Sequence, residues 1–305
     1  MAHINDGLPF LSKDASDHFS SYEAFKDAIR LGALRWVAHK IAVDANMPDS
    51  RELRAQAARL VMPEHAIACD DYAAFIFGAD TYAPGQRWEH RPTYLVPHAR
   101  YVSRPGYAIV RQSTGIPDHD VIDIEGVRLT TPVRTASDIL RRHYRPYALA
   151  AGDALYRAGV ILPGEVADHL SGLFHLRGLQ QARQLVTMLT SEAESHGESW
   201  LRCRLVDAGF PRPAIQFKIP DAMGIIRRFD MAYEEYRVAP EYDGREHHTA
   251  TGDRDLDEIR REDFRRRLGW RFPIGTYECV FGEDPTYELG VGAMIGRQPL
   301  PRWWR

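Results

Sequence analysis

Two spacings of hydrophobic residues alternate along this chain. Strong helix formers and apolar stripes at helical spacing predict helices in the first two thirds, over residues 51–60, 66–78, 131–140, 147–158 and 178–189. In the third of these segments, Thr131 and Pro132 suit the N-cap and the first helical position. Residues 107–112 and 121–129 alternate as strands do, and the second segment turns at Glu125-Gly126. We therefore expect a mostly helical α+β domain here.

The last third of the chain has a different pattern. Two helices are predicted, an amphipathic one over 198–208 and a charged one over 256–268. Strands are predicted over residues 215–219, 225–232, 236–243 and 270–274. This order of elements predicts an α/β domain with helices on both faces of a mixed sheet. Small polar residues at 190–197 separate the two patterns, so we expect domains over 1–190 and 191–305.

Composition and charge narrow the class of protein. The chain has 305 residues, of which 44% are hydrophobic and 27% are charged, the balance of a globular protein and not of a disordered one. A formal net charge of −3 excludes a protein that binds polyanions through its overall charge, although it leaves room for a local basic groove. Cys69, Cys203 and Cys279 are far apart and odd in number, so we expect no disulfide framework and a cytoplasmic protein.

Several common signatures are missing from the sequence. No stretch approaches the length of about 18 apolar residues that crosses a membrane, and the N-terminus has no signal-peptide pattern, so no membrane partner is expected. The glycines at 290–296 have the wrong spacing for a dinucleotide loop, and the chain holds no P-loop, HExxH or GxSxG motif. No nucleotide cofactor is therefore expected.

Acidic residues gather where two predicted strands end. Asp230 closes the segment RRFD, and Glu241 and Asp243 belong to the segment EYDG after the next turn. Residues i and i+2 of a strand share a face, so Glu241 and Asp243 point the same way, and Asp230 joins them if the two strands pair. Clustered carboxylates of this kind favour Mg²⁺ or Mn²⁺. His248, a few residues further on, could carry a proton or hold a phosphate oxygen.

Each of these residues also has an ordinary structural interpretation. A single carboxylate at a strand end is usually solvated, an Asp-Gly pair commonly ends a strand, and His247-His248 suits a polar loop. The arginines of residues 254–267 are interleaved with acids, and a solvated helix face with salt bridges explains about half of them. It is the ordered set, and no single member, that indicates a site.

This ordered set resembles the very-short-patch-repair-like endonucleases of the PD-(D/E)xK restriction-endonuclease fold. The match covers about a third of the chain: the helix start SHGESWLR with Glu198, then Phe229-Asp230, then EYDG with His248, then the arginine-rich helix that runs into Leu268-Gly269-Trp270. The resemblance implies that Asp230 and Glu241 bind the metal, that Glu198 assists from its helix, and that His248 acts near the scissile phosphate. Asp243 stands where the parent motif has lysine, and Pro240 precedes Glu241 in a strand expected to be central.

The function that this resemblance implies is a Mg²⁺- or Mn²⁺-dependent DNA endonuclease or nickase in defence or repair. The cation would polarise the phosphate and lower the pKa of a bound water. Basic side chains near the acids are candidates for contacts with the DNA backbone: Arg228, Arg245, Arg260, Arg261 and Arg265.

The N-terminal region resembles the AbiEi-type antitoxins of actinobacteria, through residues 49–78 and the segment LTTPVRTASD at 129–138. In that family a winged helix that binds DNA precedes this region, and here it would span residues 19–42. The alternative function is therefore a catalytically inactive AbiEi-like antitoxin or a DNA-binding transcriptional regulator. A third function, a module that neutralises a cognate toxin protein, needs neither metal nor DNA.

Overall fold

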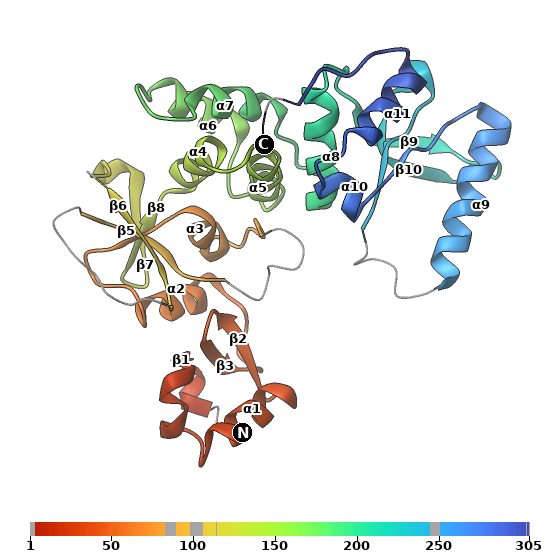
Figure 1. Ribbon diagram of the computed structural model, residues 1–305. Helices are drawn as coiled ribbons and strands as arrows, with labels where there is room; N and C mark the ends of the chain where they lie inside the picture. The colour runs from red at the N-terminus through yellow and green to blue at the C-terminus, as the bar shows by residue number, and fades with distance from the viewer. Residues whose placement is uncertain are drawn as a thin grey trace. The chain divides into compact units, whose positions relative to one another are not determined.

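The computed structural model describes residues 4–82, 90–97, 106–113, 115–244, 251–302 and 304, with the backbone alone for residues 97 and 251–257. The chain divides into two compact units. Unit 1 comprises Met1–Arg142 and Ala154–Thr187, and unit 2 comprises His143–Asp153 and Met188–Arg305. Both units combine helices with β-sheets, which confirms the predicted α/β class (Figure 1).

Unit 1 starts with a three-stranded antiparallel sheet in the order β1-β3-β2. Its elements are η1 (Ile4–Gly7), β1 (Phe10–Leu11), η2 (Ser12–Asp17), α1 (Tyr22–Arg30), β2 (Leu34–Ala38) and β3 (Ile41–Asp44). Helix α1 begins after Ser21, whose hydroxyl accepts a hydrogen bond from the backbone N–H of Ala24 at 3.1 Å. Phe25 of α1 contacts Phe10 of β1 with ring centroids 6.2 Å apart, so the helix packs against this sheet.

A five-stranded mixed sheet forms the centre of unit 1, in the order β6-β5-β4-β8-β7. Its strands are β4 (Ile67–Ala68), β5 (Thr93–Pro97), β6 (Ile109–Ser113), β7 (Val121–Ile124) and β8 (Val127–Thr130), with η4 (Asp118–Asp120) before β7. The predicted strands at 107–112 and 121–129 are confirmed, and the second is the β7–β8 hairpin. The helix predicted over 66–78 is wrong at its start, because β4 pairs with β5 on one side and β8 on the other.

The remaining helices of unit 1 pack on this sheet and on one another. They are α2 (Arg51–Arg59), α3 (Asp70–Ile76), α4 (Pro132–Arg142), α6 (Pro163–Ser171), α7 (Leu179–Leu185) and η5 (Val186–Met188), while α5 (Arg145–Arg157) runs through the boundary between the units. The Thr131 hydroxyl accepts the backbone N–H of Arg134 at 3.2 Å, as expected for the start of α4. Among the helices that the structure describes, none has both the length and the apolar composition needed to cross a membrane.

Gly178 is expected to be the least replaceable glycine of unit 1, because a Cβ there would lie 1.8 Å from the carbonyl oxygen of Arg141 and the residue has a φ of +83°. Gly178→Ala should therefore lower the free energy of unfolding by about 2 kcal/mol. Gly159 is the matched control: its φ is +67°, but no atom lies within 4 Å of an added Cβ. Gly159→Ala should lower that free energy by only about 1 kcal/mol. Urea denaturation measures both, and equal losses would contradict the clash at Gly178.

Unit 2 carries the elements of the last third of the chain. They are α8 (His196–Asp207), β9 (Ala214–Pro220), β10 (Ile226–Ala232), η6 (Glu234–Tyr236), β11 (Glu241–Asp243), α9 (Thr251–Leu268), β12 (Ile274–Thr276), α10 (Tyr277–Phe281) and α11 (Thr286–Ile295). Strands β9 and β10 form an antiparallel hairpin, and β11 pairs in parallel with β12. The helices predicted over 198–208 and 256–268 and the hairpin over 215–232 are confirmed.

The strand predicted over 236–243 is shorter than expected, because η6 ends at Tyr236 and the next residue, Arg237, has a φ of +50°. Only the last three residues form β11. The strand predicted over 270–274 likewise begins late, at Ile274. The backbone N–H of Glu241 donates to the carbonyl of Pro273 at 3.2 Å, so Pro240 does not displace Glu241 from its pairing.

Helices pack on two sides of the strands in unit 2 (Figure 1). Phe264 of α9 contacts Phe229 of β10 with ring centroids 5.0 Å apart, in a cluster that includes Trp270 and Phe272. A second cluster joins α8, α10 and α11 to the strands through Leu201, Leu205, Met231, Val280 and Val291. Two apolar clusters therefore support the strands that carry Asp230 and Glu241.

Candidate functional site

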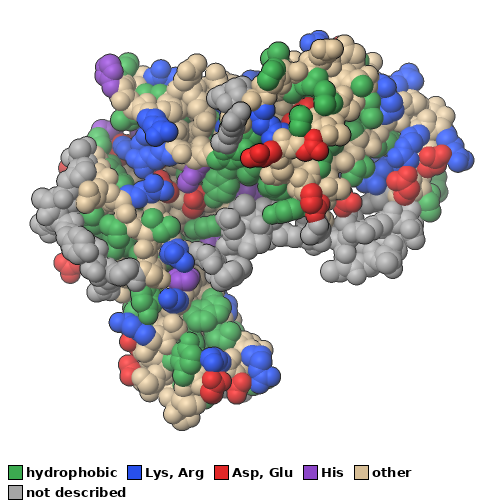
Figure 2. Space-filling view, in the orientation of Figure 1, with side chains coloured by type: hydrophobic (Ala, Val, Ile, Leu, Met, Phe, Trp, Pro, Cys, Tyr) green, Lys and Arg blue, Asp and Glu red, His purple; other side chains and the backbone are tan. Residues whose placement is uncertain are grey.

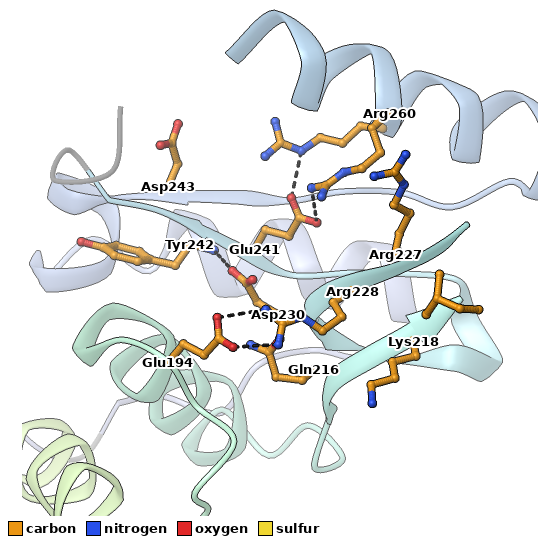
Figure 3. A pocket seen from close by; sticks show the side chains of 12 residues that line it. Glu194, Gln216, Lys218, Arg227, Arg228, Asp230, Glu241, Tyr242, Asp243 and Arg260 are labelled. Atoms are coloured by element: carbon orange, nitrogen blue, oxygen red, sulfur yellow. Dashed lines mark hydrogen bonds and ion pairs between the residues drawn. The ribbon is translucent and has the colours of Figure 1, made fainter. Parts of the chain in front are cut away.

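A polar pocket of about 750 Å³ lies where β9, β10, β11 and α9 meet (Figure 3). Asp230, Glu241 and Asp243 all line it. Basic residues line it as well: Lys218, Arg227, Arg228, Arg260 and Arg261. The structure thus brings together three of the acids that the sequence singles out, and it surrounds them with positive charge.

Asp230 lies at an interruption of the β9–β10 ladder. Phe229 pairs with Phe217 and Met231 with Ile215, whereas Asp230 and Gln216, which lie between these pairs, are not paired. Gln216 has a φ of +49°, a left-handed conformation that disfavours a residue with a side chain by roughly 1–2 kcal/mol. Such strain is often found at functional sites. Gln216 was missed by the sequence reasoning, because nothing local marks an unpaired position within a strand.

The carboxylate of Asp230 connects β10 to β11. Its Oδ2 accepts a hydrogen bond from the backbone N–H of Tyr242 at 3.0 Å, where a backbone ladder bond would otherwise be expected. Partial burial and the negative charge of Glu198 raise the pKa of Asp230 to about 6. Asp230 therefore exchanges a proton close to neutral pH.

Glu241 is buried, with 5% of its surface exposed. Its Oε2 accepts a hydrogen bond from Nε of Arg261 at 2.9 Å, and Nη2 of Arg260 lies 3.8 Å from Oε1 (Figure 3). Oε1 itself has no hydrogen bond among the described residues. Burial raises the pKa of Glu241, and the charge of Arg261 acts in the opposite direction. The glutamate thus already has a positive counter-charge from α9.

Glu198 lies in the first turn of α8, next to the pocket acids. Its Oε2 accepts the backbone N–H of Glu194 at 3.0 Å and the side-chain amide of Gln216 at 3.2 Å. Burial raises the pKa of Glu198. Gly197 lets this turn approach β11, because a Cβ at this position would lie 2.0 Å from the ring of Tyr242. Glu198 therefore caps the N-terminus of α8, and its carboxylate also orients the side chain of Gln216.

Asp243 shares the strand β11 with Glu241, two residues away, and Figure 3 shows both side chains on the same side of the strand. This agrees with the period of a β-strand. His248 and Arg245 lie outside the described residues. Their roles therefore stay predictions.

Among the described residues, the arginines proposed for DNA contacts have carboxylate partners. Arg228 lies 2.8 Å from Glu194, Arg261 lies 2.9 Å from Glu241, and Arg265 lies 2.6 Å from Glu258. Figure 2 shows basic and acidic side chains interspersed over α9. The outer face of α9 therefore carries salt bridges, as the sequence predicts. Contact of these arginines with DNA stays a prediction.

The donor set of the pocket offers a divalent cation two carboxylates. Within the part of the chain that the structure describes, no three His, Cys, Asp or Glu side chains are grouped as metal ligands. Mg²⁺ at sites that process phosphates commonly uses one or two carboxylates, with water and phosphate oxygens as its other ligands. Asp230 and Oε1 of Glu241, which has no hydrogen bond among the described residues, are the oxygens that could serve, whereas Arg261 on Oε2 and Arg260 at 3.8 Å from Oε1 oppose a cation there.

Unit 1 contains a buried polar network in the segment TPVRTASD. Arg134 donates to Asp120 at 2.7 Å and to Asp138 at 3.0 Å. His169 of α6 lies 2.8 Å from the hydroxyl of Ser137 through Nδ1, and 3.3 Å from Asp120 through Nε2. Ser137 has no exposed surface, so this Ser-His-Asp arrangement cannot act on a substrate. Its role is to join α4, α6 and η4.

Comparisons with known proteins find sequence similarity that extends over both units of the chain. Residues 66–188 match the family model described as AbiEi antitoxin C-terminal domain. Two proteins of Mycobacterium tuberculosis, uncharacterized protein MT2308 (strain CDC 1551 / Oshkosh) and uncharacterized protein Rv2248 (strain ATCC 25618 / H37Rv), are each 30% identical to the chain over 254 residues, 80% of this chain and 85% of theirs. The crystal structure of RV2827C protein from Mycobacterium tuberculosis matches with a TM-score of 0.30 and 13% identity, over 63% of this chain and 74% of that one.

Proposed function

Since this chain belongs to the protein family of MT2308 and Rv2248, and its residues 66–188 match the AbiEi antitoxin C-terminal domain, we propose that it is an antitoxin that binds and neutralises a cognate toxin protein. The match to the antitoxin domain is the observation that carries this proposal. It spans the sheet and helices from β4 to η5.

The physical character of that domain supports a binding role. In its buried network, Arg134 donates hydrogen bonds to both Asp120 and Asp138, and satisfied buried networks rigidify a fold and specify one packing. A rigid surface binds a protein partner without a large loss of conformational entropy. In unit 2, the ion pair between Arg261 and Glu241 supports the version of this proposal in which the nuclease-like site is inactive.

Growth rescue tests the proposal. The partner to test is the protein encoded beside the gene for this chain, expressed alone and together with the full-length chain in a bacterial host. We expect the neighbour to arrest growth, co-expression to restore it, and the two proteins to elute together in size-exclusion chromatography. The variant Glu241→Gln is the matched control and should restore growth equally, because Glu241 lies outside residues 66–188, which match the antitoxin domain. Continued arrest, with both proteins present and no joint elution, would refute the antitoxin.

A second function is favoured by one specific observation, namely that Asp230 and Glu241 line the same pocket. The function is hydrolysis of DNA phosphodiester bonds with Mg²⁺ or Mn²⁺. In this function Asp230 and Glu241 would hold the cation, which would polarise the phosphate and activate water. The predicted role of His248 is to orient or deprotonate that water.

Plasmid cleavage tests the nuclease. With Mg²⁺ or Mn²⁺, the wild type should convert supercoiled plasmid to nicked or linear forms, and Asp230→Ala should not. His248→Ala should abolish cleavage while DNA binding stays nearly intact, because one neutral histidine contributes little to counterion release. If the plasmid stays intact with every metal tested, the nuclease function is refuted and the antitoxin proposal is unaffected.

A further inference from the structure

The turn between β9 and β10 carries an exposed apolar tip, formed by Met223, Ile225 and Ile226. Met223 is 82% exposed, more than any other large hydrophobic side chain that the structure describes, and Ile225 and Ile226 are 45% and 58% exposed. Single exposed apolar side chains are common, but a contiguous group of them often marks a surface that another molecule covers. The tip is therefore a candidate contact surface.

Asp221 holds this tip in one conformation. Its Oδ1 accepts hydrogen bonds from the backbone N–H groups of Met223 and Ile225, each at 2.9 Å. Its Oδ2 accepts a hydrogen bond from Nε of Arg227 at 2.9 Å, and Gly224 permits the turn through its φ of +79°. A surface that is already ordered loses little conformational entropy when it binds a partner.

A mostly apolar pocket lies elsewhere in unit 2, between β12, α10 and α11, and is called here the α10–α11 pocket. Its volume is about 510 Å³, within the usual size range of pockets that hold small ligands. Its wall includes Ile274, Cys279 and Tyr287. The Tyr287 hydroxyl donates to the carbonyl of Pro273 at 2.8 Å, which fixes this ring in the wall. The pocket is thus preformed and has room for an apolar side chain.

The tip and the pocket lie in regions of opposite charge. Glu278 and Asp284 line the pocket, and residues 276–290, which supply most of its lining, contain no lysine or arginine. Residues 214–228, which form the hairpin, contain three basic residues and one acidic residue. An apolar centre with a polar rim is the usual anatomy of a contact between proteins. The two surfaces are therefore complementary both in polarity and in charge.

We propose that the chain self-associates through unit 2, with the β9–β10 tip of one copy in the α10–α11 pocket of a second copy. Met223 supplies the apolar side chain that enters the pocket, and the basic residues of the hairpin lie beside Glu278 and Asp284. The occupant is a second copy because both complementary surfaces belong to this chain, and Met223 does not line the pocket of its own copy. The inference goes beyond both proposed functions, since neither uses Met223 or this pocket.

Sedimentation velocity of the full-length protein tests the role of the tip. We expect the wild type to self-associate over about 1–100 μM, as a contact with a micromolar Kd would. Met223→Glu should weaken this association about tenfold or more, because a charge would enter an apolar pocket that carboxylates already line. Phe174→Glu is the matched control, because Phe174 is 70% exposed but belongs to unit 1. It should associate as the wild type does.

A variant that fills the pocket tests the other side of the contact. Gly290 of α11 lines the pocket, and a Cβ there would meet no atom within 4 Å. Gly290→Leu should therefore be tolerated by its own chain and should weaken self-association about tenfold or more. Gly164→Leu is the control, because Gly164 lies in helix α6 of unit 1 and has the same free space. Circular dichroism confirms that each variant is folded.

Disulfide formation tests which residues meet. Cys279 lines the pocket, whereas Cys69 and Cys203 are buried. Met223→Cys should therefore form a disulfide with Cys279 of a second copy on mild oxidation with diamide, which gives a covalent dimer on a nonreducing gel. Adding Cys279→Ser should remove that dimer.

A wild type that stays monomeric at every concentration would overturn the inference. Equal association of the wild type, Met223→Glu and Gly290→Leu would overturn it as well, and so would the absence of a disulfide that depends on Cys279. None of these results would affect the antitoxin or the nuclease, because growth rescue and plasmid cleavage test those functions separately.

Discussion

Arg204→Ala is expected to lower the free energy of unfolding of unit 2 by about 3–5 kcal/mol, the range for removal of one partner from a buried ion pair. The Arg204 side chain on α8 has no exposed surface. Its Nε and Nη2 donate to Glu288 of α11 at 2.8 and 2.6 Å. Its other donors bind backbone carbonyls at the ends of α10 and before α11, those of Cys279, Val280, Gly282 and Asp284. One side chain thus holds three helices of unit 2 together.

Urea denaturation followed by tryptophan fluorescence measures this loss. Arg266→Ala is the control, because Arg266 is 77% exposed and pairs only at the surface with Glu262. It should change the free energy of unfolding by less than about 0.5 kcal/mol. The double variant Arg204→Met with Glu288→Met should recover part of the loss, because neither partner of the fully buried pair is then left without the other. Arg302, which also pairs with Glu288 at 2.9 Å, loses that partner, so the recovery should not be complete. Equal midpoints for Arg204→Ala and Arg266→Ala would show that the buried pair is not a determinant of stability.

Asp230→Asn is expected to stabilise the protein near neutral pH and not in acid. The pKa of Asp230 is raised from 3.8 to about 6, so the folded state holds the proton more tightly than the unfolded state does. Stability from this group is fully present below its unfolded pKa and is lost as pH rises through the folded pKa. A difference of about two pKa units corresponds to at most about 3 kcal/mol. Asparagine keeps an acceptor for the N–H of Tyr242 and carries no charge.

Denaturation with a chelator present, at about pH 4 and about pH 7.5, tests this pH dependence. The gain of Asp230→Asn over the wild type should appear only at the higher pH. Asp263→Asn is the control, because the hydrogen bond from Arg267 lowers the pKa of Asp263. That variant should show no gain at the higher pH. A gain of Asp230→Asn that is the same at both pH values would contradict the raised pKa of Asp230.

Local signals in the sequence determined many of the elements. The Ser50 cap begins α2, the Glu125-Gly126 turn joins β7 to β8, and Thr131 begins α4, each through atoms only a few residues apart. The two-residue period of a strand likewise determined that Glu241 and Asp243 point to one side of β11. These features depend on bonds and turns within a short segment, so the order of residues is sufficient to predict them.

Pairing between distant strands overruled the local helix propensity at some positions. Ile67 and Ala68 continue a pattern suited to a helix, yet they become β4 because strands more than twenty residues away pair with them on both sides. The predicted strand at 236–243 was shortened by the turn at Tyr236 and Arg237, and helices α6, α10 and α11 were missed. The sequence of a short segment does not show which distant backbone groups will form hydrogen bonds with the N–H and C=O groups of that segment.

The sequence alone determined which carboxylates are candidates for a site, namely Asp230, Glu241 and Asp243. Only the tertiary structure decided what neutralises them. Arg261 of α9 pairs with Glu241 of β11, twenty residues earlier in the sequence. Gln216 of β9 donates a hydrogen bond to Glu198 of α8. Ion pairs and hydrogen bonds depend on the distance between two groups in space, and both interactions weaken as that distance grows. Residues far apart in the sequence that meet in this way produce no periodic pattern along the chain.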